Sequence, residues 1–340
     1  MDRIVLAHGG GGEEMNELIS KIIFKTFDNE ILLAQNDSAI LPASDFFTHS
    51  VQKCDTQKLA FSTDSFVVNP IFFNGGDIGK LAVCGSINDL AMVGAEAKFL
   101  SCALLLEEGL EIKSLEKILC SMKEQAQNAG VKIVCGDTKV LPKGSADKIF
   151  INTSCIGAIL RDGIETANLK IGAKILLSGD IGRHGAVILA HRENLIVDTQ
   201  SDCKSLKDVT KALLDSSVRV LCMRDATRGG IAAVLNEWAN FKGYMLKVYQ
   251  DAIPVTQEVL GICEILGFEP YDIANEGTFL LAVEREDEAK ALEILRRFHP
   301  LAASVGEVVD DSESGVILQT LYGSQRFLEL PKGELLPRIC

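Results

Sequence analysis

A cysteine closes the sequence, in a setting that favours thiol chemistry over core packing. Cys340 follows Pro337, Arg338 and Ile339, and two prolines and a glycine in its approach disfavour a helix or a central strand. Chain termini fray, so a thiol there is free to act as a nucleophile and to carry a group between two sites. Fully extended, the last eleven or so residues reach roughly 35 Å. A carrier tail is one interpretation; an incidental terminal residue or a weak docking tail is the other.

Three aspartates lie in small-residue settings that we expect at strand ends or turns: Asp64 in S-T-D-S, Asp89 in I-N-D-L and Asp137 in C-G-D-T-K. Magnesium takes hard oxygen ligands and is commonly shared between a few carboxylates and the phosphates of a substrate. Acidic loops that the fold brings together would supply such a site. Taken singly, each aspartate is better explained as a turn or helix-capping residue.

The segment Gly136-Asp137-Thr138-Lys139 follows a predicted apolar strand and offers a contact for phosphate. Glycine lets a ligand approach the backbone, and lysine meets a phosphate as a point charge. The sequence contains neither a G-x-x-x-x-G-K-[ST] loop nor a G-x-G-x-x-G turn. If this chain uses ATP, it binds the nucleotide by a route other than a P-loop or a Rossmann turn.

Two polar segments in the second half are further candidates. The stretch M-R-D-A-T-R-G-G precedes a predicted helix and suits an anion site, although an N-cap by Thr227 with solvated arginines explains it equally well. Glu276, in A-N-E-G-T, lies before a predicted buried strand and is a candidate general base. His184, in G-R-H-G, is more simply explained as a capping or surface histidine.

Length, charge and cysteine usage limit the classes of protein that fit. The 340 residues predict two domains or one large one, and the net charge of −13 argues against a general nucleic-acid or anionic-membrane surface. The sequence has no apolar run of about 18 residues, the length that a membrane-spanning helix needs, and no signal peptide is visible. The ten cysteines are scattered without a C-x-x-C pair, as expected in a reducing cytoplasm.

Hydrophobic periodicity predicts an α+β protein with two halves of similar size and a boundary within 162–172. We expect helices over 13–27, 76–93, 115–129, 186–192, 206–217, 229–241, 257–266 and 286–297. We expect strands over 58–61, 66–68, 98–106, 131–135, 149–159, 174–177, 245–249, 278–283, 303–308 and 316–319. Small residues in the 76–93 helix, Gly79 among them, predict close backbone packing.

Together these motifs resemble one known family. S-T-D-S-F-V-V, N-P-I-F-F-N-G-G-D-I-G and C-G-S-I-N-D-L-A-M-V-G-A resemble the ATP-binding half of the PurM-like superfamily. G-D-T-K-V, D-I-G-R-H-G, M-R-D-A-T-R-G-G, A-N-E-G-T and the terminal P-R-I-C are similar to the HypE family of hydrogenase maturation factors. The resemblance spans residues 7–340, with no match assigned for 41–56.

The resemblance implies a two-domain α+β fold. It would comprise a glycine-rich segment and helix (1–45), a mixed-sheet ATP-binding domain that forms a homodimer (46–162), an α/β sandwich domain (163–328) and a flexible tail (329–340). The implied activity is that of a carbamoyl dehydratase. A carbamoyl group taken from the carbamoyltransferase HypF would be dehydrated with ATP to a thiocyanate on the terminal cysteine. The cyanide would then pass to iron held by HypC and HypD, for [NiFe]-hydrogenase.

The family also implies roles for individual residues. Asp64, Asp89 and Asp137 would hold Mg²⁺ and the phosphates of ATP, supported by Asn88 and Thr138. Lys139 would neutralise the transferred phosphoryl group, Glu276 would take the proton from the carboxamide nitrogen, and Cys340 would be the covalent carrier. Asp225 and Arg228 would line the path of the tail.

Three rival functions remain open at this point. A selenophosphate synthetase would be expected to carry a reactive cysteine in its glycine-rich segment, and residues 8–14 have none. A small-molecule kinase has no use for a terminal cysteine. A non-catalytic scaffold that docks through its tail would keep its partner function after loss of Asp89 and Asp137.

Overall fold

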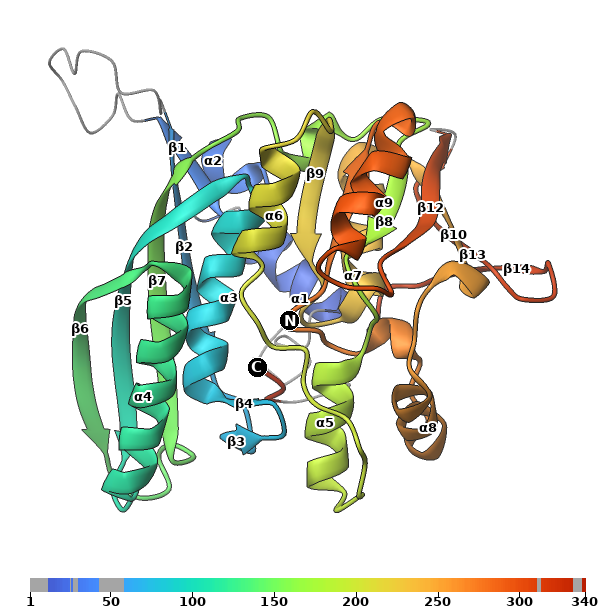
Figure 1. Ribbon diagram of the computed structural model, residues 1–340. Coiled ribbons are helices and arrows are strands. Elements are labelled where there is room, and N and C mark those ends of the chain that lie inside the picture. The colour runs from blue at the N-terminus through green and yellow to red at the C-terminus, as the bar shows by residue number, and fades with distance from the viewer. Residues whose placement is uncertain (1–11, 25, 27–29, 43–57, 311–312, 333–337) are drawn as a thin grey trace, which may run out of the picture.

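The computed structural model describes residues 12–24, 26, 30–42, 58–310, 313–332 and 338–340. Two β-sheets lie side by side with helices between and around them (Figure 1). The expected α+β architecture, with one sheet in each half of the chain, is confirmed. Within the described residues, no helix is both long enough and apolar enough to cross a bilayer.

The first sheet is mixed and has the strand order β1-β2-β7-β5-β6, with β5 and β6 alone parallel. Its strands are β1 (Ala39–Pro42), β2 (Lys58–Phe66), β5 (Ala95–Glu107), β6 (Lys132–Leu141) and β7 (Ile149–Ile159). Helices α3 (Ile78–Met92) and α4 (Ile112–Ala129) cover one face, and no described helix covers the other (Figure 1). A small hairpin, β3 (Phe72–Phe73) with β4 (Gly76–Asp77), precedes α3.

The second sheet has the order β14-β13-β10-β12-β8-β11-β9, with β10 and β13 alone parallel. Its strands are β8 (Lys174–Leu177), β9 (Val220–Asp225), β10 (Met245–Tyr249), β11 (Phe279–Val283), β12 (Ala303–Asp310), β13 (Gly315–Gln319) and β14 (Gln325–Phe327). Neighbouring strand residues alternate between two cores: Leu177 packs with α7 (Gly230–Lys242), whereas Leu176 packs with α6 (Lys207–Leu214) and α9 (Glu288–Arg296). The sheet is therefore the middle layer of a sandwich.

The remaining elements frame the two sheets. Helices α5 (Arg183–Arg192) and α8 (Gln257–Leu266) extend from the second half, and α1 (Glu13–Leu18), a π-helix (Ile19–Phe24) and α2 (Glu30–Leu33) precede the first sheet. Short 3₁₀ helices lie at Thr166–Asn168, Gln250–Ala252, Pro270–Asp272 and Arg285–Asp287. The single helix expected over 13–27 is thus divided, and part of it lies outside the described residues.

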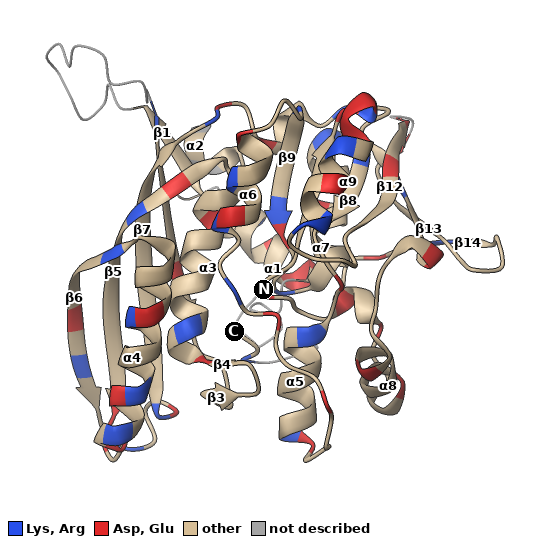
Figure 2. Ribbon diagram, viewed as in Figure 1, with Lys and Arg blue, Asp and Glu red and all other residues tan. Residues whose placement is uncertain are grey.

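Helix α3 is the element that joins the halves. Asp77 caps its first turn by accepting from the N–H groups of Gly79 (2.8 Å) and Lys80 (3.0 Å). The helix is almost free of charged residues (Figure 2) and is buried along nearly its whole length. A Cβ on Gly79 would lie 2.5 Å from the carbonyl oxygen of Ile118 in α4, so glycine is required for this close approach. At its other end, Met92 packs in the core of the second half.

The aspartate motifs lie within regular elements, which corrects the expectation of strand ends and turns. The segments 58–61 and 66–68 are not two strands around a turn, because β2 runs unbroken through Asp64. Asp89 lies inside α3. Asp137 lies inside β6, which continues past the predicted end at Cys135 as far as Leu141. Continuous ladder hydrogen bonds outweighed the turn propensity of Ser, Asp and Gly.

Candidate functional site

The end of the chain is docked against the body of the protein, which differs from the expectation of a fraying terminus. Ile339 is 2% exposed and packs in the core of the first half, with Cys340 beside it. The N–H of Val67 donates to the main-chain oxygen of Cys340 (3.0 Å), and the N–H of Asn69 donates to that of Arg338 (3.1 Å). The tail thus adds two ladder-like hydrogen bonds to the segment that follows β2.

Side chains from both halves hold the same residues. Arg338 donates to the carbonyl of Val67 (2.9 Å) and forms an ion pair with Asp147 (2.6 Å). Arg192, in the last turn of α5, donates to the carbonyls of Asn69 (2.8 Å) and Arg338 (2.6 Å). The docked tail therefore bridges the first half and α5.

His184 is buried in the first turn of α5, so the expectation of a surface or capping histidine is wrong. Its Nε2 lies 2.7 Å from the carbonyl oxygen of Ile339, and its Nδ1 lies 2.8 Å from Oγ of Ser201. Burial lowers the pKa of His184, so the imidazole is neutral near pH 7. Because a carbonyl oxygen only accepts, Nε2 carries the proton and Ser201 donates to Nδ1.

Carboxyl groups from both halves converge beside the docked tail. Asp64 and Asp89 share a hydrogen bond, and Oγ of Ser62 donates to Asp89. Burial raises the pKa of Asp89 well above its usual range, and the charges of Asp64, Asp225 and Asp37 raise it further. The pKa of Asp225 is raised by burial and then by the charge of Asp37. Asp64 and Asp89, predicted from separate motifs, are thus neighbours.

Asp37 was not predicted as a site residue. It lies in N-D-S, just before the 41–56 stretch for which the sequence offered no match. Burial raises its pKa to about 6, against the opposing charge of Arg224, whose Nε lies 2.9 Å from its carboxylate. Arg224 also pairs with Glu237 (3.2 Å), so it is not the solvated arginine of the alternative interpretation. Nor does Thr227 cap α7, which begins after Gly229 without a side-chain cap.

Arg228 is the cation whose charge favours the thiolate of Cys340. The charge of Cys340, followed by those of Asp64, Glu276 and Asp89, raises the pKa of this guanidinium. Arg228 as a whole is an exposed residue, unlike Asp225 and Glu276. The arginine in the terminal motif, Arg338, instead pairs with Asp147.

Glu276 is 3% exposed, and its Oε1 has no hydrogen-bond partner among the described residues. Burial raises its pKa well above the usual range, with further increases from the charges of Asp225, Asp202 and Asp64 and an opposing effect of Arg228. Glu276 and Cys340 are therefore surrounded by the same carboxylates and the same guanidinium. An unpartnered buried carboxyl group of this kind is typical of a functional site.

Asp137, Thr138 and Lys139 do not join this group within one chain. Asp64 pairs across the sheet with Thr153, Cys102 and Gly136 in turn, so Asp137 belongs to the opposite, outer face, about 14 Å away over three strand spacings. The side chains of Asp137 and Lys139 are 62% and 68% exposed and pair with each other at 3.1 Å. The three-aspartate site expected from the sequence is therefore not formed by a single chain.

Asn88 has a structural task that the sequence did not predict. Its amide nitrogen donates to the carbonyl of Lys204 (3.1 Å), and its amide oxygen accepts from the N–H of Leu206 (2.7 Å). Both ends of the amide are thus occupied by the backbone of the second half. Its contribution to the phosphate and metal shell stays a prediction.

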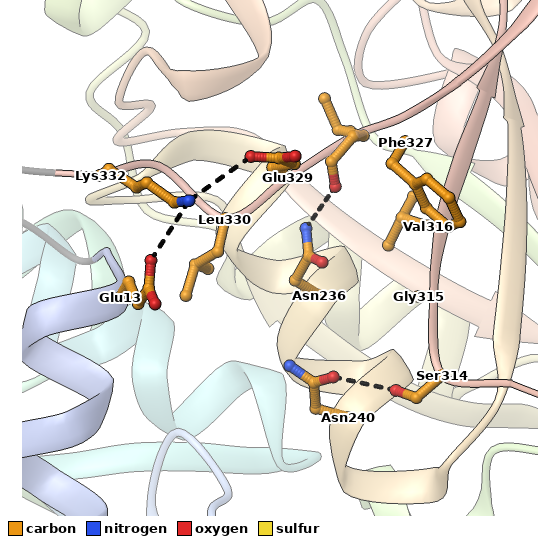
Figure 3. Close-up of a pocket in the computed structure, with 11 residues that line it drawn as sticks. Glu13, Asn236, Asn240, Ser314, Gly315, Val316, Phe327, Glu329, Leu330 and Lys332 are labelled. Carbon is orange, nitrogen blue, oxygen red and sulfur yellow. Dashed lines mark hydrogen bonds and ion pairs between the residues drawn. The ribbon is translucent and has the colours of Figure 1, made fainter.

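A cavity of about 290 Å³ lies where the tail leaves β14 and contains none of the predicted site residues (Figure 3). On one side Lys332 pairs with Glu13 (3.6 Å) and Glu329 (3.7 Å), and the N–H of Glu13 donates to the carbonyl of Pro331 (3.0 Å). On the other side Asn236 donates to the carbonyl of Leu328 (2.9 Å). These contacts fix the root of the tail against α1 and α7.

The donor chemistry of the carboxylate group fits a magnesium ion. Asp37, Asp64, Asp89 and Asp225 offer only hard oxygen ligands, and their mutual repulsion is the kind that a divalent cation relieves. Among the described residues, no three Asp, Glu, His or Cys side chains are already arranged to hold a metal. The four aspartates would therefore need further ligands to hold the ion. In magnesium sites that bind nucleotides, the phosphates commonly supply these ligands.

Two family models match the chain. Residues 36–159 match the N-terminal domain, and residues 170–319 the C-terminal domain, of the AIR synthase related proteins. Carbamoyl dehydratase HypE of Escherichia coli (strain K12) is 44% identical over 348 residues, with 100% of each chain covered. A thiamine monophosphate kinase of Aquifex aeolicus covers 92% of this chain at only 18% identity, so the identity and not the length of the match separates the chain from that rival.

Two solved structures are also similar to this chain in sequence and in fold. A HypE in complex with ATP is 40% identical, has a TM-score of 0.81 and is matched over 99% of this chain and 100% of that one. The HypE–HypF complex contains a chain that is 41% identical, with a TM-score of 0.82 over 92% of this chain and 99% of that one.

The surroundings of Cys340 predict a slow thiol. Burial raises its pKa to about 12, with Arg228 opposing and Glu276 raising it further. The docked thiol then holds about a thousandfold less thiolate than an ordinary peptide thiol, and its reactivity should increase about tenfold per pH unit between pH 8 and 10. In EDTA-treated protein, iodoacetamide should label Cys340 much more slowly than the exposed Cys120, as measured by peptide mass.

Arg338→Ala is the matched release variant, because it removes the bonds to Val67 and Asp147. It should accelerate labelling of Cys340 about tenfold and leave Cys120 unchanged. Equal rates for Cys340 and Cys120 in the unmodified protein would contradict the docked arrangement.

Proposed function

The chain belongs to the HypE family of carbamoyl dehydratases, and from this premise we propose that it dehydrates a carbamoyl group carried on Cys340, at the expense of ATP, to a thiocyanate. One observation carries the proposal: the docked Cys340 lies within the electrostatic environment of Arg228, Glu276 and Asp64. The carrier atom, the candidate base and the candidate metal ligands thus belong to one site.

The reaction requires that an amide oxygen be turned into a leaving group. The carbamoyl group is held as S–C(=O)–NH₂ on the sulfur of Cys340. Transfer of the γ-phosphoryl group to its oxygen, with loss of one N–H proton, gives S–C(=NH)–O–phosphate and ADP. Loss of the second N–H proton together with phosphate leaves S–C≡N. The sum is one water removed from the carbamoyl group and one ATP hydrolysed to ADP and phosphate.

Glu276 is the proposed acceptor of a nitrogen proton. Its unpartnered oxygen is available for an N–H group, and its buried position excludes competing water. Its raised pKa results in part from Asp225 and Asp64, so compensation of those charges by a cation would lower the pKa and generate the carboxylate. Arg228 would offset the negative charge that develops beside Cys340.

Asp64 and Asp89, with Asp37 and Asp225 beside them, are the proposed ligands of the magnesium ion that accompanies ATP. When bound, the ion supplies charge neutralisation for the phosphates. With the ion bound, these carboxylates would hold the nucleotide phosphates next to the docked tail. ATP binding by a relative of 40% identity supports this assignment.

Lys139 and Asp137 are proposed to act across a homodimer, whereas Thr138 between them faces the inner side of the sheet. The outer face of the first sheet carries a row of apolar side chains, Phe61, Ile156 and Phe99, of which the two phenylalanines are exposed. A second copy packed face to face would cover this row, and such a contact is isologous. Asp137 and Lys139 share that face, so the partner's site is the one they would reach.

The carbamoyl group is proposed to come from a HypF-type carbamoyltransferase, since a relative of this chain is solved in complex with HypF. Cys340 would leave its docked position to collect the group and return for dehydration. Delivery of the cyanide to an iron centre held by HypC and HypD remains the proposed last step.

The mass of the C-terminal peptide tests this function. After incubation with a HypF-type carbamoyltransferase, carbamoyl phosphate and ATP without chelator, Cys340 should gain a carbamoyl group and then lose one water. With EDTA present after carbamoylation, the water should remain. A Cys340 that stays unmodified beside an active carbamoyltransferase would overturn the carrier assignment; water loss without ATP would overturn the dehydration step.

Subunit mixing tests the action of Lys139 across the dimer. Lys139→Ala and Cys340→Ala proteins should each be inactive alone. After denaturation and joint refolding in equal amounts, about a quarter of the sites should work, because half of the dimers are mixed and each has one complete site. Mixing Cys340→Ala with Cys340→Ser is the control and should recover nothing. Absence of recovery in the first mixture, with mixed dimers verified by mass, would place Lys139 in its own chain's site.

A further inference from the structure

Residues 201–204 contact the main chain of Glu276 directly and are linked to the docked tail through His184. We propose that this coupling segment positions the two reacting groups of the dehydration: Ser201 holds the tail through His184, and Asp202 holds the main chain of Glu276. The inference rests on the proposed function and names positioning residues for it. Nothing in the motifs of the sequence pointed to this segment.

The tail side of the coupling segment is a directed chain of hydrogen bonds. His184 donates from Nε2 to the carbonyl of Ile339 (2.7 Å), and Ser201 donates to Nδ1 (2.8 Å). The hydroxyl oxygen of Ser201 in turn accepts from the N–H of Cys203 (3.1 Å). Because the carbonyl of Ile339 can only accept, Nε2 of His184 carries the proton, and the hydroxyl of Ser201 stabilises this tautomer by donating to Nδ1.

The other side of the coupling segment encloses the main chain of Glu276. The carboxylate of Asp202 accepts from the N–H groups of Glu276 (3.1 Å) and Gly277 (2.9 Å). The N–H of Lys204 donates to the carbonyl of Glu276 (3.3 Å). Glu276 is therefore held by both of its main-chain polar groups.

Close packing supports the same assignment. A Cβ on Gly277 would lie 1.8 Å from the carbonyl oxygen of Asp202, so the glycine of N-E-G is required by this contact. At the tail side, a Cβ on Gly75 would lie 2.9 Å from the nitrogen of Ser201. Close contacts therefore restrict the coupling segment on both sides. At its end, the amide of Asn88 in α3 donates to the carbonyl of Lys204.

The two contacts predict separable effects. Asp202→Asn replaces one acceptor oxygen by an NH₂ group that faces an N–H donor, so Glu276 loses its alignment while the tail keeps its own bonds. Ser201→Ala removes the donor to His184, so the tail loosens while the bonds between Asp202 and Glu276 remain. Asp208→Asn and Ser205→Ala are the matched controls, because they make the same chemical changes nearby and touch neither His184 nor Glu276.

Two measurements test the proposal in the full-length protein. In a single turnover, water loss from carbamoylated Cys340 should be about tenfold slower in Asp202→Asn, with little change in the KM for ATP or in the labelling of Cys340 by iodoacetamide. In Ser201→Ala, labelling of Cys340 should be about tenfold faster. Both controls should behave as the unmodified protein. If Asp202→Asn does not fold, Asp202→Ser replaces it, since its hydroxyl still accepts one bond.

Water loss at the unmodified rate in Asp202→Asn, or unchanged labelling in Ser201→Ala, would overturn the proposal. The proposal would also be overturned if, in each variant, the rate of water loss and the rate of labelling both changed in proportion to the unfolding midpoint. A purely structural role of the segment would change the two rates together. Failure of the unmodified protein to convert carbamoylated Cys340 would instead reject the proposed function. The labelling measurement still decides the role of Ser201 in that case.

Discussion

Partly buried negative charge is the constraint around which this molecule is arranged. Asp64 and Asp89 come from the first half, and Asp225 and Glu276 come from the second. Burial raises the pKa of each, and the charges of neighbouring carboxylates further raise the pKa of Asp89, Asp225 and Glu276. Such a group of carboxyls is unfavourable unless protons, arginines or a metal compensate for it. Arg228 supplies one positive charge, and a magnesium ion with its nucleotide would supply the rest. Binding of the magnesium–nucleotide complex would relieve this unfavourable repulsion, and the relief would contribute to the affinity for that complex.

The reacting sulfur of the docked tail fits this electrostatic setting because it is neutral. The thiol of Cys340, with a pKa near 12, is protonated near pH 7, and the carbamoyl and cyano forms of the sulfur are also neutral. The main-chain bonds to Val67 and Asn69, and the pairs formed by Arg338 and Arg192, supply the docking affinity at a distance from the reacting atom. Docking and chemistry can therefore be altered separately.

The sequence predicted much of the fold and of the functional class, and it failed where the answer depends on distant contacts. Asp64, Asp89 and Asp137 were predicted to converge; the first two are neighbours, and Asp137 does not join them within one chain. Asp137 lies on the outer face because side chains alternate between the two faces along β6. The sequence predicted that this strand would end at Cys135, so it could not predict the face of Asp137. His184 bonds a carbonyl 155 residues away, so no local pattern could reveal its burial. Asp37 likewise depends on Arg224, in the other half.

The most direct test of the account is a single turnover with Glu276→Gln. The variant retains the shape of the side chain and loses its ability to take a proton. We expect it to accept a carbamoyl group on Cys340 and to bind ATP normally, while water loss slows about a hundredfold or more. Water loss at the unmodified rate in this variant would contradict the assignment of Glu276 as the base and, with it, the view that the two halves converge in order to bring this carboxyl group to the docked cysteine.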